Sequence, residues 1–211
     1  MTTRVILCRH GATLAHGRIC GSYDVALSCE GVAQAQALAE ALRAVRPAGL
    51  YTSPLRRARD TAAAMGAVHG IEPVTVDELR EVDFGIFEGL TAAEAEAADP
   101  VVFGAWTTGP AAVRFPGGGT YAEVAARARE AAARLRARHS GQTFVVVAHD
   151  GPLRALIAEA LGRDGAYAFQ LELRHCGVSV VDWEGDAATV PIVDAAPGTL
   201  ALGALRRPMR D

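Results

Sequence analysis

The sequence contains no lysine and no asparagine, and all 21 of its basic residues are arginine. Without lysine, the chain has no lysine Schiff base, general base or phosphate ligand, so arginine, histidine, hydroxyl or backbone N–H groups must hold any anion. The formal net charge is −3. A weakly acidic balance argues against a nucleic-acid partner, because such partners select basic surfaces.

Other common signals are also missing. No run approaches the roughly 18 consecutive apolar residues of a membrane span, so we expect no membrane association. The N-terminus shows no basic region followed by an apolar one, so no secretory signal is predicted. The four cysteines show no CxxC or Cys/His zinc spacing. We therefore expect reduced thiols, a cytoplasmic location and no metal site.

What is present is typical of a globular domain. Half of the 211 residues are hydrophobic, which is enough for one buried core. We expect a single domain over residues 1–211. The segment after about residue 197 is weakly patterned, which predicts a mobile tail.

Apolar runs and helical spacings alternate along the chain. They predict strands over 4–8, 49–52, 73–76 and 143–148, a closing strand pair over 175–183 and 187–194, and helices over 30–45, 53–68, from 91 onward, 120–138 and 152–161. Strands separated by helices predict an α/β fold. We expect a three-layer sandwich whose mainly parallel central sheet has helices on both faces.

Local signals refine the predicted helices. Val32, Leu38 and their apolar neighbours at helical spacing predict the buried face of the helix over 30–45. Ser53, followed by proline, is predicted to cap the helix over 53–68. Thr91 and Thr120 each precede a glutamate by three residues, which predicts capping boxes.

Charged and titratable residues stand at the ends of two predicted strands. Arg9 and His10 end the first apolar strand, and His149, Asp150 and Gly151 lead from the strand over 143–148 into a helix. Ligands gather at the carboxyl ends of parallel strands, and a helix N-terminus adds donors for an anion. If the two strands are neighbours, both imidazoles face one anion-binding pocket.

Five motifs in order resemble the histidine phosphatase superfamily, in its phosphoglycerate-mutase-like branch. They are Arg-His-Gly-Ala-Thr at 9–13, "SPLRRARDTA" at 53–62, "LREVDFGIFEG" at 79–89, "FPGGGT" at 115–120 and "AHDG" at 148–151. The resemblance is greatest to the cobalamin-pathway and broad-specificity phosphatases. It implies one histidine-phosphatase domain with a phosphoglycerate-mutase-like fold.

The resemblance also implies roles. His10 is the expected nucleophile, which must be neutral, and neighbouring Arg9 disfavours its imidazolium. Arg9, Arg57 and a charged His149 are the expected phosphate ligands, so no metal or other cofactor is needed. Glu81 matches the family's general acid and base. Position alone does not separate it from Glu88, which is expected to be structural or at the rim.

The chain departs from the family pattern at three positions. His16 stands where the family has a phosphate-contacting asparagine, and is either a pocket donor or a loop residue. Gly119 replaces an acid, which removes a polar contact. Asp150 replaces a small residue and is expected to turn from the phosphate toward a helix N-terminus or an arginine. With Thr13 of the first motif, His16 and Asp150 are the further candidate substrate-binding residues.

The expected activity is hydrolysis of a small phosphorylated metabolite, as in the α-ribazole phosphatases, which the "LREVDFGIFEG" segment resembles. A cofactor-dependent phosphoglycerate mutase and a catalytically poor phospho-ligand-binding protein are the alternatives. The expected partner is a small phosphorylated substrate, and homodimerisation is left open.

Overall fold

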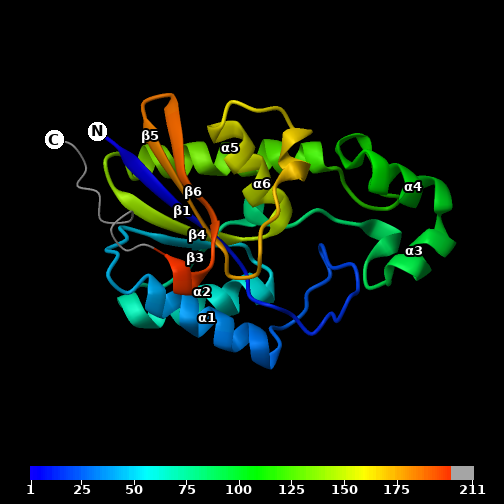
Figure 1. Ribbon diagram of the computed structural model, residues 1–211, viewed down its shortest axis with the longest axis horizontal. Helices are drawn as coiled ribbons and strands as arrows, with labels where there is room; N and C mark the ends of the chain where they lie inside the picture. Colours follow the sequence, from blue (N-terminus) through cyan, green and yellow to red (C-terminus); the bar gives the residue numbers. More distant parts are fainter. Residues whose placement is uncertain (201–211) are drawn as a thin grey trace.

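The computed structural model describes residues 1–200, and its centre is a six-stranded sheet (Figure 1). The strands lie in the order β3-β2-β4-β1-β5-β6. The first four run parallel, and β5 and β6 close the sheet with antiparallel pairings. The predicted mainly parallel sheet with a closing strand pair is therefore confirmed. The strands are β1 (Thr3–Arg9), β2 (Leu50–Thr52), β3 (Val74–Thr75), β4 (Thr143–Ala148), β5 (Val178–Glu184) and β6 (Ala187–Ala195).

Helices cover both faces of the sheet because successive residues of a buried strand point to opposite sides. Ile6 and Cys8 of β1 face an apolar cluster that α1 and α2 complete. Val5 and Leu7 face a second cluster, completed by α5 and α6. Figure 1 shows the two helix pairs on opposite sides, so the predicted three-layer sandwich is confirmed. The helices are α1 (Cys29–Ala41), α2 (Arg56–His69), α3 (Ala92–Ala98), α4 (Pro100–Thr108), α5 (Tyr121–Arg138) and α6 (Asp150–Ala160).

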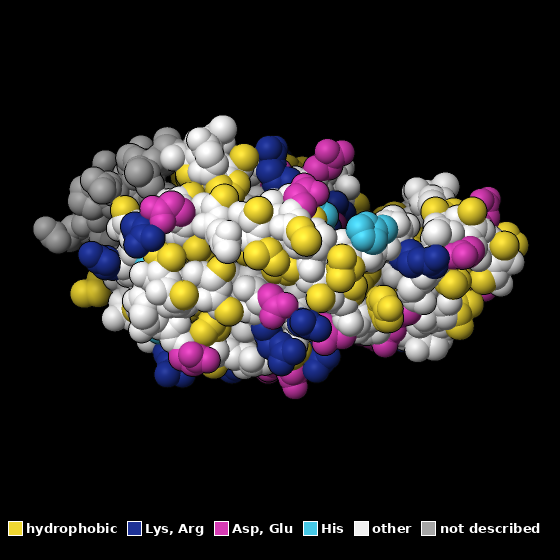
Figure 2. Space-filling view, turned by 90° about the horizontal axis from the view of Figure 1, so that it is seen from below, with side chains coloured by type: hydrophobic (Ala, Val, Ile, Leu, Met, Phe, Trp, Pro, Cys, Tyr) yellow, Lys and Arg dark blue, Asp and Glu magenta, His cyan; other side chains and the backbone are white. Residues whose placement is uncertain are grey.

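Helices α3 and α4 form a lobe at one end of the sandwich (Figure 1). Figure 2 shows the lobe set off from the body by a waist, with acidic and basic side chains interspersed on the visible face. Phe84, Phe87, Trp106 and Phe115, here named the aromatic cluster, form a core for this end of the molecule. The ring centroids of Phe84 and Phe115 are 4.8 Å apart. The predicted capping box at Thr91 is present and starts α3.

Two details of the predicted helices are wrong. Ser53 does not cap α2, which begins after Leu55 with no side-chain cap. The Ser53 hydroxyl is instead hydrogen-bonded to His149, 96 residues away in sequence. Val32 is 46% exposed, because α1 turns Ala35 and Leu38 toward the sheet and Val32 away from it.

The carboxyl ends of β1 and β4 lie side by side, as the predicted pocket requires. In the parallel register Arg9 is paired with Ala148. The backbone N–H of His10 donates to the Ala148 carbonyl at 3.0 Å. Helix α6 begins at Asp150, directly after His149. The sheet thus brings His10 and His149 to one edge, beside a helix N-terminus.

Within residues 1–200, no helix is both long and apolar enough to cross a membrane. The predicted mobile tail after about residue 197 opens with a 3-10 turn over Pro197–Thr199. Its remainder, from residue 201, lies outside the described residues.

Candidate active site

A cavity of about 350 Å³ opens at the carboxyl ends of β1 and β4. Its lining includes six of the predicted site residues, Arg9, His10, Thr13, His16, Arg57 and Glu81. His149 is fully buried behind them, and Asp150 is not among the lining residues. The structure therefore gathers most of the candidates around one hollow.

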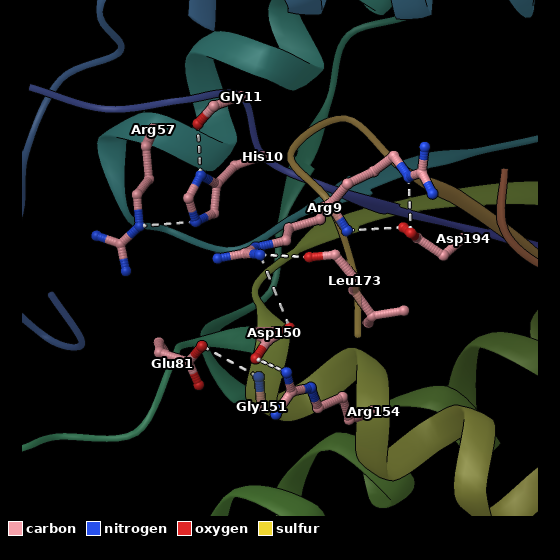
Figure 3. Close-up of polar contacts among 11 residues, drawn as sticks. Arg9, His10, Gly11, Arg57, Glu81, Asp150, Gly151, Arg154, Leu173 and Asp194 are labelled. Carbon is pink, nitrogen blue, oxygen red and sulfur yellow. Dashed lines mark hydrogen bonds and ion pairs between the residues drawn. The ribbon is translucent and has the colours of Figure 1, made fainter. Parts of the chain in front are cut away.

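The ring of His10 is held in one tautomer. Its Nδ1 lies 2.7 Å from the carbonyl oxygen of Gly11, which can only accept, so Nδ1 carries the proton. The Gly11 N–H in turn donates to Thr61 Oγ1 at 3.1 Å. The other ring nitrogen, Nε2, is left with its lone pair and accepts from Arg57 Nε at 3.2 Å. His10 thus presents an unprotonated ring nitrogen at the cavity, and Figure 3 draws its contacts with Gly11 and Arg57.

Burial keeps His10 neutral. It lowers the pKa of the imidazole well below its usual range, and the charge of Arg57 lowers it further, more than Arg9 does. The hydrogen bond to Gly11 acts in the opposite direction and is outweighed. The sequence assigned this effect to Arg9; the structure adds burial and Arg57 as the larger causes.

His149 is also held in one tautomer, by Arg57 and by Ser53, the residue predicted to cap a helix. Its Nδ1 accepts from Arg57 Nε at 3.2 Å, so Nε2 carries the proton and donates to Ser53 Oγ at 2.7 Å. The ring centroids of His10 and His149 are 5.1 Å apart. Ser53 therefore orients the second histidine instead of capping a helix.

The predicted charge of His149 differs from what its surroundings favour. Burial, Arg57 and His10 lower the pKa of His149 well below its usual range, so the protein alone favours a neutral ring. An imidazolium at this position requires the added field of a bound dianion.

Arg57 connects the two histidines to the loop that follows β1. It is 1% exposed, and its Nη1 and Nη2 donate to the carbonyls of Tyr23 and Gly21 at 3.0 and 2.7 Å. These bonds direct Nε at both imidazoles. The guanidinium is therefore placed for an anion held between the two rings.

Glu88 holds that loop in place. Its carboxylate accepts hydrogen bonds from the backbone N–H groups of Gly21 and Tyr23, each at 3.0 Å, and from that of Phe84 at 2.9 Å. Glu88 is not among the lining residues of the cavity. The expectation that Glu88 is structural agrees with these contacts.

Glu81 does line the cavity, and burial raises the pKa of its carboxyl group. Hydrogen bonds from the N–H groups of Gly151, at 3.1 Å, and Val82, at 2.9 Å, partly oppose that effect. A carboxyl group with a raised pKa keeps its proton to a higher pH than a solvated one, which suits it to donate and accept a proton. The structure thus separates Glu81 from Glu88, which the sequence alone does not.

The contact between Glu81 and Gly151 leaves no room for a side chain. A Cβ on Gly151 lies 2.3 Å from Glu81 Oε1, which is too close for a real contact. We expect Gly151→Ala to displace the carboxyl group and lower kcat for an alkyl phosphate about 100-fold. Gly104→Ala is the matched control, since a Cβ there meets nothing within 4 Å. Steady-state kinetics test this, and equal activities of the two variants would contradict it.

Arg9, at the end of β1, lies beside Asp150, at the start of α6 (Figure 3). Arg9 Nη1 donates to the Leu173 carbonyl and lies 3.9 Å from Asp150 Oδ1. Asp150 Oδ2 is 2.8 Å from Arg154 Nη2. The expectation that Asp150 turns toward an arginine agrees with this geometry. Burial raises the pKa of Asp150, and Arg9 and Arg154 oppose the rise.

Thr13 and His16 lie on the loop side of the cavity. Thr13 Oγ1 accepts from the Ala15 N–H at 3.3 Å. His16 has a left-handed backbone, with φ of 45°, and its exposed side chain lines the cavity. Of the two alternatives for His16, its position fits a pocket donor.

His175, which was not predicted from the sequence, also lines the cavity. Its ring centroid lies 5.5 Å from that of His10. No motif marks it, because it stands in the turn before β5, far from the other site residues in sequence. Its proximity to an apolar strand was the only available signal.

The two buried histidines make stability depend on pH. Their pKa values are lowered in the folded state, so below about pH 6.5 the unfolded chain binds protons that the folded chain does not. The free energy of unfolding therefore falls as pH falls below that value. We expect wild type to lose about 1 kcal/mol more than His149→Gln between pH 7.5 and 5.5 in urea unfolding. A His16→Gln control, changed on the exposed loop, should keep the wild-type dependence; identical slopes for wild type and His149→Gln would contradict the prediction.

Together these features define an α/β protein whose cavity is lined by Arg9, Arg57 and the unprotonated imidazole nitrogen of His10. The family model of the histidine phosphatase superfamily (branch 1) matches residues 5–194. The chain belongs to this superfamily, and the resemblance carried by the five motifs is confirmed.

Individual relatives are similar to this chain in sequence or in fold. The chain is 33% identical over 190 residues to the bifunctional protein Rv2228c of Mycobacterium tuberculosis, covering 89% of this chain but 52% of that protein. It thus spans about half the length of this relative. It is 32% identical over 183 residues to phosphoserine phosphatase 1 of Hydrogenobacter thermophilus, covering 86% and 87% of the two chains. The solved structure of the α-ribazole phosphatase from Shigella flexneri has a TM-score of 0.85 at 26% identity, covering 92% and 96%.

Proposed function

We propose that this protein is a phosphomonoesterase that hydrolyses a small phosphorylated metabolite through a phosphohistidine on His10. The observation that carries the proposal is the lone pair of His10 Nε2, which faces the same point as Arg57 Nε and His149 Nδ1. A phosphoryl group at this point meets a nucleophile, a guanidinium and a second imidazole. Phosphoryl transfer depends mainly on such positioning and charge neutralisation.

In the first step His10 Nε2 forms a bond to phosphorus while the bond from phosphorus to the ester oxygen breaks. The carboxyl proton of Glu81 passes to that oxygen, and the alcohol leaves. Arg9, Arg57 and the protonated His149 offset the charge on the phosphoryl oxygens.

In the second step the Glu81 carboxylate takes a proton from water as the water oxygen attacks phosphorus. The bond between phosphorus and Nε2 breaks, inorganic phosphate leaves, and His10 and Glu81 return to their starting protonation states. The raised pKa of Glu81 suits it to both steps.

Hydrolysis is favoured over isomerisation by what surrounds Glu81. The superfamily's mutases grip a phosphorylated acid with residues that follow the general acid and with a downstream lysine. Here Val82, Asp83 and Phe84 follow Glu81, and the chain has no lysine. Val82 and Phe84 are buried in the core around the aromatic cluster, so they do not grip a substrate.

The relatives support a small ester as substrate. Proteins named phosphoserine phosphatase and α-ribazole phosphatase are among those to which the chain is similar. We propose α-ribazole 5′-phosphate and phosphoserine as the first substrates to assay, within a wider panel of phosphorylated metabolites scored by phosphate release.

A single mixture distinguishes phosphatase from mutase. Purified protein is incubated with 3-phosphoglycerate and a trace of 2,3-bisphosphoglycerate, and both 2-phosphoglycerate and free phosphate are followed. We expect phosphate release from monoesters and little interconversion of the two phosphoglycerates. Isomerisation at a kcat of roughly ten per second or more, with negligible phosphate release, would overturn the proposal. Binding without turnover of any ester would favour the phospho-ligand-binding alternative.

A further inference from the structure

His175 is a third imidazole beside the nucleophile, placed there by a tight turn before β5. The backbone of Cys176 has a left-handed φ of 54°. Its N–H donates to the carbonyls of Arg9 and His10 at 3.1 and 3.2 Å. This docks residue 175 against the end of β1, with its ring 5.5 Å from that of His10.

The ring nitrogens of His175 are free, in contrast to those of the buried histidines. Within the described part of the chain no group hydrogen-bonds to them, and the half-buried side chain lines the cavity. His139, a structural histidine, has Tyr51 Oη at 2.7 Å and Gln142 Oε1 at 3.1 Å on its two nitrogens. The buried ring of His139 is thus held on both sides, whereas the ring of His175 is half-buried at the cavity, where a bound ligand can reach it.

One positive and one negative side chain act on the ring of His175, and the positive one has the larger effect. Arg9 faces it from β1 and Glu30 from the start of α1, while His10 lies against its ring. The neighbouring Arg174 is paired with Asp194 at 2.7 Å. Burial and Arg9 lower the pKa of His175, and Glu30 only partly opposes them. The free protein therefore favours a neutral ring, and a dianion bound at Arg9 favours a charged one.

We propose that His175 is a ligand of the substrate's phosphoryl group and takes up a proton when the dianion binds. This rests on the proposed function, because it places the phosphoryl group at His10. The proton gives His175 a second N–H donor and a positive charge directed at the cavity. Substrate binding is then coupled to pH through this residue, in addition to any proton taken up by His149.

Histidine NMR measures the proton directly on the wild-type protein. The chain has six histidines, and His175→Gln identifies the ring C–H signal of His175 by its loss. We expect the apparent pKa of His175 to rise by about one pH unit or more when inorganic phosphate saturates the site. The signals of His69 and His139, which lie outside the cavity lining, should not move. An unchanged His175 signal would overturn the proposal.

Kinetics provide a second readout. We expect His175→Gln to raise KM for p-nitrophenyl phosphate about tenfold at pH 6.0, with kcat changed less than about threefold. At pH 8.5, where the wild-type ring loses its proton even with the dianion bound, KM should agree with wild type within about twofold. His69→Gln, at the far end of α2, is the control and should match wild type at both values. A His175→Gln profile parallel to wild type would overturn the proposal.

The results separate this proposal from the proposed function. Wild-type turnover with no phosphate-dependent movement of His175 removes His175 as a ligand and leaves the phosphatase intact. Movement of His175 without turnover of any ester removes the phosphatase and leaves a phosphate-binding His175. Neither turnover nor movement removes both.

Discussion

Replacing His10 with alanine is expected to reduce kcat by at least about 1000-fold, a loss of about 4 kcal/mol from transition-state stabilisation. The variant lacks the Nε2 lone pair that Arg57 and His149 surround, so no covalent intermediate forms. Turnover of p-nitrophenyl phosphate measures this, with His69→Ala as a control that leaves the site untouched. Activity within about tenfold of wild type would remove His10 as the nucleophile.

The same prediction has a chemical readout. Wild type mixed briefly with labelled substrate and then denatured should carry a label that is stable to alkali and lost in acid, as expected for phosphohistidine. The alanine variant should carry none. A label stable to acid would point to a hydroxyl or another group instead of an imidazole.

Glu81→Gln is expected to slow the first step by roughly 100-fold to 10,000-fold for an alkyl phosphate, whose alkoxide must be protonated as it leaves. For p-nitrophenyl phosphate, whose phenolate leaves without a proton, the first step should slow less than about tenfold. Single-turnover measurements isolate this step from phosphoenzyme hydrolysis, which Glu81 also assists.

Glu88→Gln is the matched comparison. Glu88 acts on the loop that holds Arg57, so its loss should slow the two substrates to a similar degree. Equal losses for both substrates in Glu81→Gln would assign Glu81 to the same supporting role and contradict its part as the proton donor.

The local sequence pattern was sufficient to predict the three layers of the fold and the positions of His10 and His149 at strand ends. Each depends on features that lie close together in sequence, namely apolar alternation and the residue that ends it. Helix α4 was not predicted as a separate element, because no end was expected for the helix from residue 91 and the apolar residues of α4 show no clear helical face. In the structure Val102, Phe103 and Trp106 pack against the aromatic cluster, and no residue of the helix is fully buried. Ser53 was misplaced because a serine before a helix is usually a cap, and the contact with His149 that overrides this arises only in the folded chain.

The site shows the same division. Arg9, His10, Arg57 and Glu81 could be named from motifs, and all four line the cavity. His175 could not, because its place depends on a turn whose geometry is set by hydrogen bonds to the end of β1. Residues placed by contacts between distant segments, such as Ser53 and His175, therefore carry no signal in the local sequence.

The groups that would react in the proposed mechanism lie on two different parts of the molecule, the central sheet and the segment that packs on the aromatic cluster. His10 and His149 stand on the central sheet, whereas Glu81 stands on the segment that continues into Val82 and Phe84, whose side chains pack with the lobe. We expect a substitution that loosens that packing to move Glu81 and also, through the hydrogen bonds of Glu88 to Gly21 and Tyr23, the loop that holds Arg57. His10 and His149 should stay in place, because the pairing of β1 with β4 holds them. Substitutions in the lobe should therefore act on the site through Glu81 and Arg57, at a distance from the two histidines.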